Sequence, residues 1–107
     1  MSSSGVPEPT FTGAGTGDSC LNLFINTTLA SPDPDVVESL KKGDFLEVVA
    51  VGAEGPIQAL TDAGEIAGNI VSTRQLMLLG CLRDGTRYRA KITEHNDGEV
   101  NVLITPW

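Results

Sequence analysis

The stretch that decides the fold is residues 40–48, LKKGDFLEV, because its outline is repeated at residues 82–90, LRDGTRYRA. Each copy has a leucine that ends an apolar helical face, two polar residues, and a glycine, Gly43 or Gly85, ahead of an alternating strand. Glycine readily adopts the left-handed conformation that ends many helices, so each copy predicts a helix, a turn and a strand. The pattern identifies an architecture and no activity.

Six strands are predicted around this repeat, because segments of alternating apolar and polar side chains are separated by turn-forming residues. The predicted strands are residues 21–29, 44–51, 57–61, 65–71, 86–94 and 99–105. The three strands within residues 44–71 are expected to form an antiparallel meander. The last two are expected to form a hairpin that closes at Asn96-Asp97-Gly98.

Two helices are predicted between these strands. Asp33, followed by a proline, supplies an N-cap and a first-turn residue for a helix that runs to about residue 41. Ser72 and Gln75 have the spacing of a capping box, which predicts a second helix through Leu82. Both helices are expected to cover the ends of the sheet.

The order of these elements predicts an α+β domain. Short, mostly adjacent strands indicate a small, mostly antiparallel, partly closed β-barrel of the OB or SH3 kind, with about six strands and two short helices. A half-open α+β sheet packed on two helices is the alternative. The chain of 107 residues has room for one modest core, assigned to residues 19–107, and the Ser-, Pro- and Gly-rich residues 1–18 are expected to be a disordered tail.

Charge and cysteine content narrow the class of protein. A formal net charge of -7 repels nucleic acid and anionic membranes, so polyanion binding needs a local basic patch. No apolar run approaches the ~18 residues that span a bilayer, and residues 1–4 lack the charged start of a signal peptide.

The spacing of Cys20 and Cys81 is typical neither of a metal site nor of a redox pair. Both are expected to be reduced packing residues, unless the fold brings them together as a disulfide. We therefore expect an acidic, cytoplasmic protein with no membrane partner.

Residues 43–82 carry a pattern of short strands and turns. Gly43-Asp44 opens a strand, Asp62-Ala63-Gly64 leads into an apolar strand, and a helix begins at Ser72. This pattern resembles a HIRAN-type domain, which implies a small barrel of the kind found in or beside DNA-processing enzymes. That family usually has an Asn-Pro-x-Asp-x-Asn-Ala stretch between the first two of these strands. Here residues 52–59 read GAEGPIQA, so no functional residue is carried over.

No arrangement typical of an enzyme active site stands out. The single histidine, His95, lies beside Glu94 and Asp97 at the predicted hairpin turn, where a polar residue needs no catalytic role. No second imidazole or thiol is close in sequence to complete a metal site. The glycines of residues 13–17 follow no strand, so they do not form a phosphate-binding loop. We expect no catalytic residue, metal, cofactor or small-molecule substrate.

The first candidate surface is a basic strip on the predicted strand 86–94 and the end of the helix before it. Its members are Arg83, Arg87, Arg89 and Lys91. Strand alternation places the last three on one face and Tyr88 on the other. Such a face can bind single-stranded nucleic acid where exposed aromatic rings stack on bases, and Phe24 or Phe45 could supply such a ring. The plainer interpretation is that these basic side chains lie in solvent, protect the edge of the sheet and pair with nearby glutamates.

The second candidate surface is the second predicted helix, which is apolar nearly all round. Its candidate interface residues are Leu76, Met77, Leu78 and Gly80. A helix with so little polar surface is either wedged into the mouth of the barrel or exposed as an interface with a partner or a second copy.

Together these features predict a non-enzymatic binding module that acts through protein-protein contacts or self-assembly. The alternative is a single-stranded nucleic-acid-binding accessory domain that uses the face of Arg87, Arg89 and Lys91. The acidic net charge and the apolar helix favour a protein partner or homodimer over nucleic acid.

Overall fold

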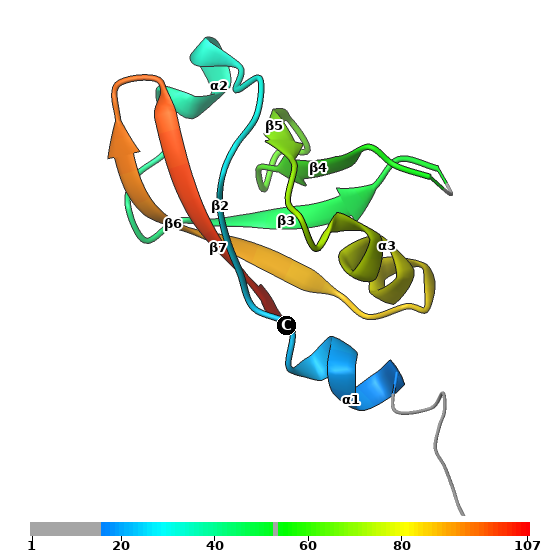
Figure 1. Cartoon of the computed structure of the whole chain (residues 1–107). Helices are drawn as coiled ribbons and strands as arrows, with labels where there is room; N and C mark the ends of the chain where they lie inside the picture. Colours follow the sequence, from blue (N-terminus) through cyan, green and yellow to red (C-terminus); the bar gives the residue numbers. More distant parts are fainter. Residues whose placement is uncertain (1–15, 53) are drawn as a thin grey trace, which may run out of the picture.

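The computed structural model describes residues 16–52 and 54–107 (Figure 1), so the predicted tail lies outside the described residues as far as residue 15. The helices of the described part are α1 (Thr16–Leu21), α2 (Pro34–Val37) and α3 (Gln75–Arg83). Its strands are β2 (Ile25–Thr28), β3 (Phe45–Ala50), β4 (Ile57–Leu60), β5 (Ile66–Ile70), β6 (Tyr88–Asn96) and β7 (Glu99–Pro106). None of these helices is long and apolar enough to cross a membrane.

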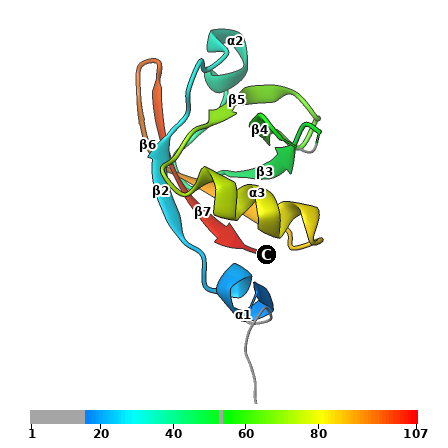
Figure 2. The same ribbon diagram turned by 45° about the vertical axis from the view of Figure 1, so that its right-hand side comes forward.

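The six strands form one antiparallel sheet in the order β2-β7-β6-β3-β4-β5. The sheet curls until its two ends meet: backbone hydrogen bonds of 2.8 Å join Ala30, just after β2, to Asn69 of β5 in both directions. The Thr27 hydroxyl also donates to the Val71 carbonyl at 2.9 Å. α2 and α3 lie at opposite ends of the curled sheet (Figure 2). The predicted α+β fold with a partly closed, six-stranded barrel is therefore confirmed.

The core fills the inside of the curl and alternates with outward-facing residues along each strand. On β6, Tyr88, Ala90 and Ile92 are fully buried, as the alternation predicted. The largest fully buried side chains are Tyr88, Leu23, Leu46, Ile57, Ile70, Leu78, Ile92, Ile104, Val100 and Val102. Because this core draws on every strand, the position of each outward-facing side chain is set by the same register that packs the inside.

The first described segment differs from the prediction. Residues 16–21 are the helix α1, which begins inside the expected tail, and β2 covers only Ile25–Thr28. Leu21, expected inside the barrel, is 60% exposed, whereas Leu23 and Ile25 are buried as the alternation required. The strand predicted from residue 21 is therefore wrong over its first four residues, because α1 extends to Leu21 and the pairing of β2 with β7 begins only at Ile25.

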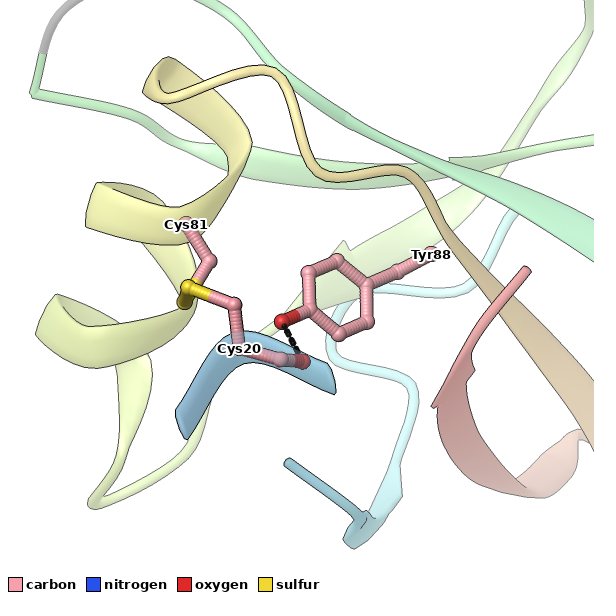
Figure 3. Close-up of a disulfide and its surroundings, with 3 residues drawn as sticks. All are labelled: Cys20, Cys81 and Tyr88. Carbon is pink, nitrogen blue, oxygen red and sulfur yellow. Dashed lines mark hydrogen bonds between the residues drawn. A yellow bond between two sulfur atoms is a disulfide. The ribbon is translucent and has the colours of Figure 1, made fainter. Parts of the chain in front are cut away.

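A disulfide joins Cys20 of α1 to Cys81 of α3, with an S–S distance of 2.05 Å. Both residues are buried, but the prediction that they are reduced is wrong. In Figure 3 the disulfide lies beside the Tyr88 ring, whose hydroxyl donates a hydrogen bond to the Cys20 carbonyl oxygen. Cysteine spacing could not predict the pair, because 61 residues separate the two and only the closed barrel brings them together.

The two copies of the repeat share their glycine conformation and their strand. Gly43 and Gly85 have φ angles of 97° and 98°, in the left-handed region that favours glycine. Gly85 ends α3 in a Schellman motif: the Thr86 amide donates to the Cys81 carbonyl at 3.0 Å and the Gly85 amide to the Leu82 carbonyl at 3.1 Å. The repeated strands, β3 and β6, pair with each other in the middle of the sheet.

The helices of the two copies differ from the prediction. Asp33 caps α2 as expected, but the helix ends at Val37, so Gly43 lies in a separate turn and caps no helix. Ser72 does not cap α3, since its hydroxyl accepts from the Arg74 amide at 3.1 Å in a turn that precedes the helix. The first copy is therefore a turn and a strand, and the second is a helix, a turn and a strand.

Candidate binding surface

The predicted basic strip is divided between two elements. Arg89 and Lys91 lie on the outward face of β6, and Arg87 directly precedes this strand. Arg83 is in the last turn of α3, where it lines a separate hollow with Arg87 and Gly85. The fold thus places three of the four basic residues on one sheet face and leaves Arg83 at its margin.

Arg89 is held between two aromatic rings. Its guanidinium carbon lies 4.3 Å from the centroid of the Phe45 ring and 5.3 Å from that of the Trp107 ring. The Arg87 guanidinium also lies 5.3 Å from the Trp107 ring. Such cation-π contacts contribute about 0.5–1 kcal/mol each at exposed sites and limit the movement of the side chain. We name these four residues, Phe45, Arg87, Arg89 and Trp107, the aromatic-arginine cluster.

Trp107 is fixed over the sheet by two hydrogen bonds. Its backbone amide donates to the Arg87 carbonyl at 3.0 Å, and its indole Nε1 donates to the Tyr88 carbonyl at 3.0 Å. The Trp107 side chain is nevertheless 61% exposed, and Phe45 is 43% exposed. The cluster is therefore a preformed surface, in which little side-chain freedom remains to be lost on binding.

Arg89 has no hydrogen-bond acceptor within residues 16–52 and 54–107. Glu47 faces it across the β3–β6 register, but the Glu47 carboxylate pairs with Arg87 at 3.6 Å. The Nε atom of Arg89 is buried and has no hydrogen-bond partner in the described part of the chain. Because buried donors are nearly always satisfied, a fixed and permanently charged guanidinium without an acceptor is the unusual electrostatic feature of this face.

A groove runs along β3 beside the cluster, with a larger hollow of about 620 Å³ and a smaller one that shares Phe45, Asp62 and Trp107 with it. Since β3 lies between β6 and β4 in the sheet, Phe45 forms the floor. One wall consists of Trp107 and the two arginines of the cluster. The other is the turn between β4 and β5, including Asp62 and Glu65, whose carboxylates make no ion pair with described residues. The two walls therefore carry opposite charge.

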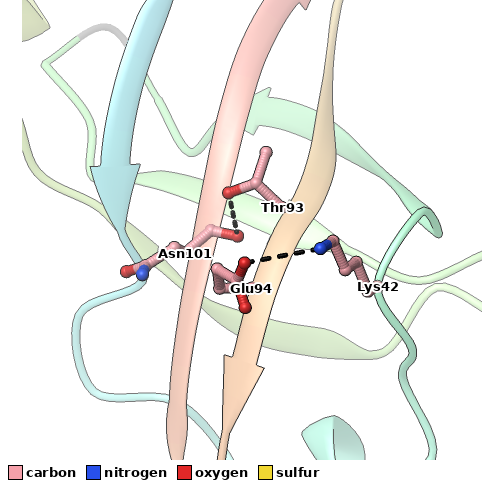
Figure 4. Close-up of polar contacts among 4 residues, drawn as sticks. All are labelled: Lys42, Thr93, Glu94 and Asn101. Atoms are coloured by element: carbon pink, nitrogen blue, oxygen red, sulfur yellow. Dashed lines mark hydrogen bonds and ion pairs between the residues drawn. The ribbon is translucent and has the colours of Figure 1, made fainter.

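The basic face ends where β6 becomes irregular. The β6–β7 register shifts between Ile92 and Glu94, and the Glu94 carboxylate pairs with Lys42 at 3.4 Å (Figure 4). The Thr93 hydroxyl between them donates to the Asn101 carbonyl at 3.2 Å. Beyond this bulge the outward face is polar, and its charged residue Glu94 is paired with Lys42. The basic face of β6 therefore lies only on the part of the strand between Trp107 and the bulge.

The second candidate surface, on α3, is smaller than predicted. Leu78 is fully buried and belongs to the core, so its assignment to an interface is wrong. Leu76 is 84% exposed and Met77 is 40% exposed, while Gly80 has no atom within 4 Å of the place a Cβ would take. We name Leu76, Met77 and Gly80 the α3 outer face. One side of the helix is thus wedged against the barrel and the other is left free in the described structure.

His95 has a structural contact. Its Nδ1 lies 2.9 Å from the Leu40 carbonyl oxygen, and because a carbonyl only accepts, this nitrogen carries the proton. The contact ties the β6–β7 hairpin to the segment after α2. No group of three or more His, Cys, Asp or Glu side chains that could hold a metal ion occurs in the described part of the chain.

Sequence reasoning missed Trp107, the residue that completes the cluster. The predicted hairpin could have indicated its position. When strand pairs are counted outward from the turn, the residues that follow β7 lie opposite the residues at the start of β6. In the structure Tyr88 pairs with Pro106, so Trp107 falls beside Arg87. Phe24, the other aromatic candidate, is exposed but lines none of the hollows that hold the cluster.

Comparison of the chain with protein-family models, with curated proteins and with solved structures gives no match. The resemblance of residues 43–82 to HIRAN-type domains therefore stays a prediction, and the function has to be argued from the surface itself.

Proposed function

We propose that this domain is a non-enzymatic protein-binding module and that the groove beside the aromatic-arginine cluster is its contact surface. The observation that carries the proposal is Arg89, fixed between Phe45 and Trp107 with no acceptor among the described residues. Tryptophan and arginine are the residue types that contribute most to binding free energy in protein interfaces, above all when they are held in place beforehand.

The charges around the cluster favour a protein over nucleic acid as the partner. Asp62 and Glu65 line the same groove as Arg89, and Glu47 pairs with Arg87. A phosphate backbone drawn to the arginines would meet these carboxylates, on a molecule whose net charge is already -7. A protein segment can present both signs of charge and so suits this surface better.

Site-specific photo-crosslinking tests the proposal. A photoreactive phenylalanine analogue at position 45 or 107 should give protein adducts in cells that make the domain, and the same analogue at Val51, exposed and outside the groove, should not. Loss of the adducts in Arg89→Gln would connect them to the cluster. Adducts that consist of nucleic acid, or equal protein adducts from position 51, would contradict the proposal.

Single-stranded nucleic acid binding is the second candidate, and the two exposed rings beside Arg87, Arg89 and Lys91 favour it. Three basic side chains could give only weak binding that falls steeply with salt. Oligonucleotides should then shift the amide resonances of residues 83–92 at ~20 mM salt, where the Debye length is about 20 Å. The double variant Arg87→Glu, Arg89→Glu should abolish those shifts. Unchanged resonances under these conditions exclude this candidate.

Self-assembly through the α3 outer face is compatible with the proposed module, because Leu76 and Met77 lie outside the groove. The cytoplasmic location stays a prediction, and the disulfide of Cys20 and Cys81 counts against it, since disulfides are rare in reducing compartments. Alkylation of free thiols at the moment of cell lysis decides this point. Two alkylated cysteines would support the cytoplasm, and two protected cysteines an oxidising compartment.

A further inference from the structure

We infer that the groove binds an extended segment of a partner protein in which neighbouring residues carry opposite charges: a carboxylate that pairs with Arg89 and a basic side chain that pairs with Asp62 and Glu65. This inference rests on the proposed function and specifies the partner's chemistry. It follows from three properties of the groove. Arg89 on one wall has no acceptor among the described residues, Asp62 and Glu65 on the other wall have no ion-pair partner among them, and the floor is aromatic.

The arginine wall selects a carboxylate. Guanidinium is a planar fork of donors that matches a carboxylate in two parallel hydrogen bonds. Arg89 is held by Phe45 and Trp107, so its orientation is set before a ligand arrives. Glu47, the acidic residue opposite it in the sheet, is engaged with Arg87. No described residue supplies an acceptor for Arg89, and its two Nη atoms are not buried, so a carboxylate of a ligand can reach them.

The opposite wall selects a positive charge. Asp62 and Glu65 are exposed in the β4–β5 turn and have no ion-pair partner among the described residues. A purely acidic segment would be repelled by this wall, and a purely basic segment by Arg87 and Arg89. Only a segment that carries both charges satisfies the two walls together.

The open shape of the groove sets the spacing of those charges. In an extended chain, successive side chains point to opposite sides and follow one another at about 3.3 Å along the backbone. A segment laid over Phe45 therefore directs one side chain towards Arg89 and the next towards Asp62 or Glu65. The preferred sequence alternates acidic and basic residues, and a block of acidic residues followed by a block of basic ones should fit poorly.

Two synthetic peptides of identical composition test this prediction. Both are hexapeptides of glutamate and lysine with acetylated and amidated ends, one with strict alternation and one with three glutamates followed by three lysines. Fluorescence of Trp107, the only tryptophan of the chain, reports occupancy of the groove, and amide resonances locate the bound peptide. The alternating peptide should bind about tenfold more tightly, the ratio expected when one charge-assisted pair is lost.

Variants of the two walls complete the test. Arg89→Gln and the double variant Asp62→Asn, Glu65→Gln should each reduce the affinity for the alternating peptide about tenfold. Arg89→Lys keeps the charge but loses the planar fork, so it should restore only part of the affinity. The control variants are Arg83→Gln, which removes a positive charge, and Glu99→Gln, which removes a negative charge. Both residues lie outside the groove, so the affinity should not change. The amide spectrum of each variant establishes that it is folded.

Each outcome has a defined meaning. Equal affinity for the two peptides, or binding that the wall variants do not change, would overturn the inference. If neither peptide binds while crosslinking from positions 45 and 107 still yields protein adducts, the inference fails and the proposed function stands. If both peptide binding and protein adducts are absent, the proposed function fails as well.

Discussion

The hydroxyl of Tyr88, the first residue of β6, donates a hydrogen bond to the backbone carbonyl of Cys20, which lies 68 residues earlier in the chain. The same Cys20 is bonded through its sulfur to Cys81 of α3. α1 is therefore held by two different attachments, one covalent to a neighbouring helix and one polar to the barrel. Tyr88 also accepts, through its own carbonyl, the indole hydrogen bond of Trp107, so the core residue that anchors α1 also supports the binding surface.

Removing the Tyr88 hydroxyl should destabilise the domain. Tyr88→Phe keeps the ring in the core but leaves the Cys20 carbonyl without its donor, which should lower the free energy of unfolding by about 1–2 kcal/mol. Denaturant unfolding measures the loss. Thr93→Val, which removes a half-buried hydroxyl from the same strand, should cost less. A loss no larger than that of Thr93→Val would mean that the hydrogen bond of the Tyr88 hydroxyl contributes no more to the free energy of unfolding than that of Thr93.

Stability should also fall at alkaline pH because of this residue. Burial raises the pKa of Tyr88 above its usual value of 10.0. As the pH rises past 10.0, the unfolded chain loses the phenol proton first, so a stabilisation that is complete below this pH is lost as the pH climbs towards the folded-state pKa. Phenolate absorbance of this single tyrosine follows the titration directly. Tyr88→Phe should lack this contribution, and an identical alkaline decline in the variant would contradict the assignment.

Loss of the disulfide should cost more than loss of the hydroxyl. Cys20 and Cys81 are 61 residues apart, and opening a loop of that length is expected to lower the free energy of unfolding by roughly 2–4 kcal/mol. The double variant Cys20→Ala, Cys81→Ala measures this in denaturant. In that background Tyr88→Phe should cost less than in the parent, because α1 is no longer held beside the ring. Additive losses would mean that the two attachments act independently.

The two left-handed glycines should be sensitive to substitution. Gly43→Ala and Gly85→Ala should each destabilise the domain by about 1 kcal/mol or more, because alanine is strained at φ angles near 97° and 98° although there is open space for its methyl group. Gly80→Ala is the matched control: it lies inside α3, also has open space, and should stabilise the helix by about 0.5–1 kcal/mol. A neutral result at Gly43 and Gly85 together would remove the structural basis of the repeat.

The α3 outer face should mediate weak self-association. Sedimentation of the domain at increasing concentration should show a dimer, and the double variant Leu76→Glu, Met77→Glu should remain a monomer with little change in unfolding free energy, because both side chains are exposed. Leu78→Glu, by contrast, places a charge in the core and should unfold the domain. If the parent domain is monomeric at every concentration, the prediction for the α3 outer face is wrong, and the groove remains as the proposed contact surface.

Much of the fold could be predicted from local patterns. Strand alternation correctly placed Tyr88 inside and Arg89 outside, and turn glycines such as Gly85 marked where strands begin. The face of α3 was harder to predict, because its residues are apolar on every side and hydrophobicity alone could not separate buried Leu78 from exposed Leu76. Only the position of the helix against the barrel decides between them.

What the sequence determined by itself is therefore local: which residues turn, which alternate, and which face of β6 carries the arginines, since these depend on φ angles and on the two-residue period of a strand. What only the tertiary structure decided is the pairing of distant residues. Cys20 meets Cys81, and Phe45 meets Arg89, because the fold brings segments that are far apart in the chain side by side. The physical reason is that a local pattern constrains neighbours along the backbone, whereas a disulfide or a ring contact depends on the register of the whole sheet.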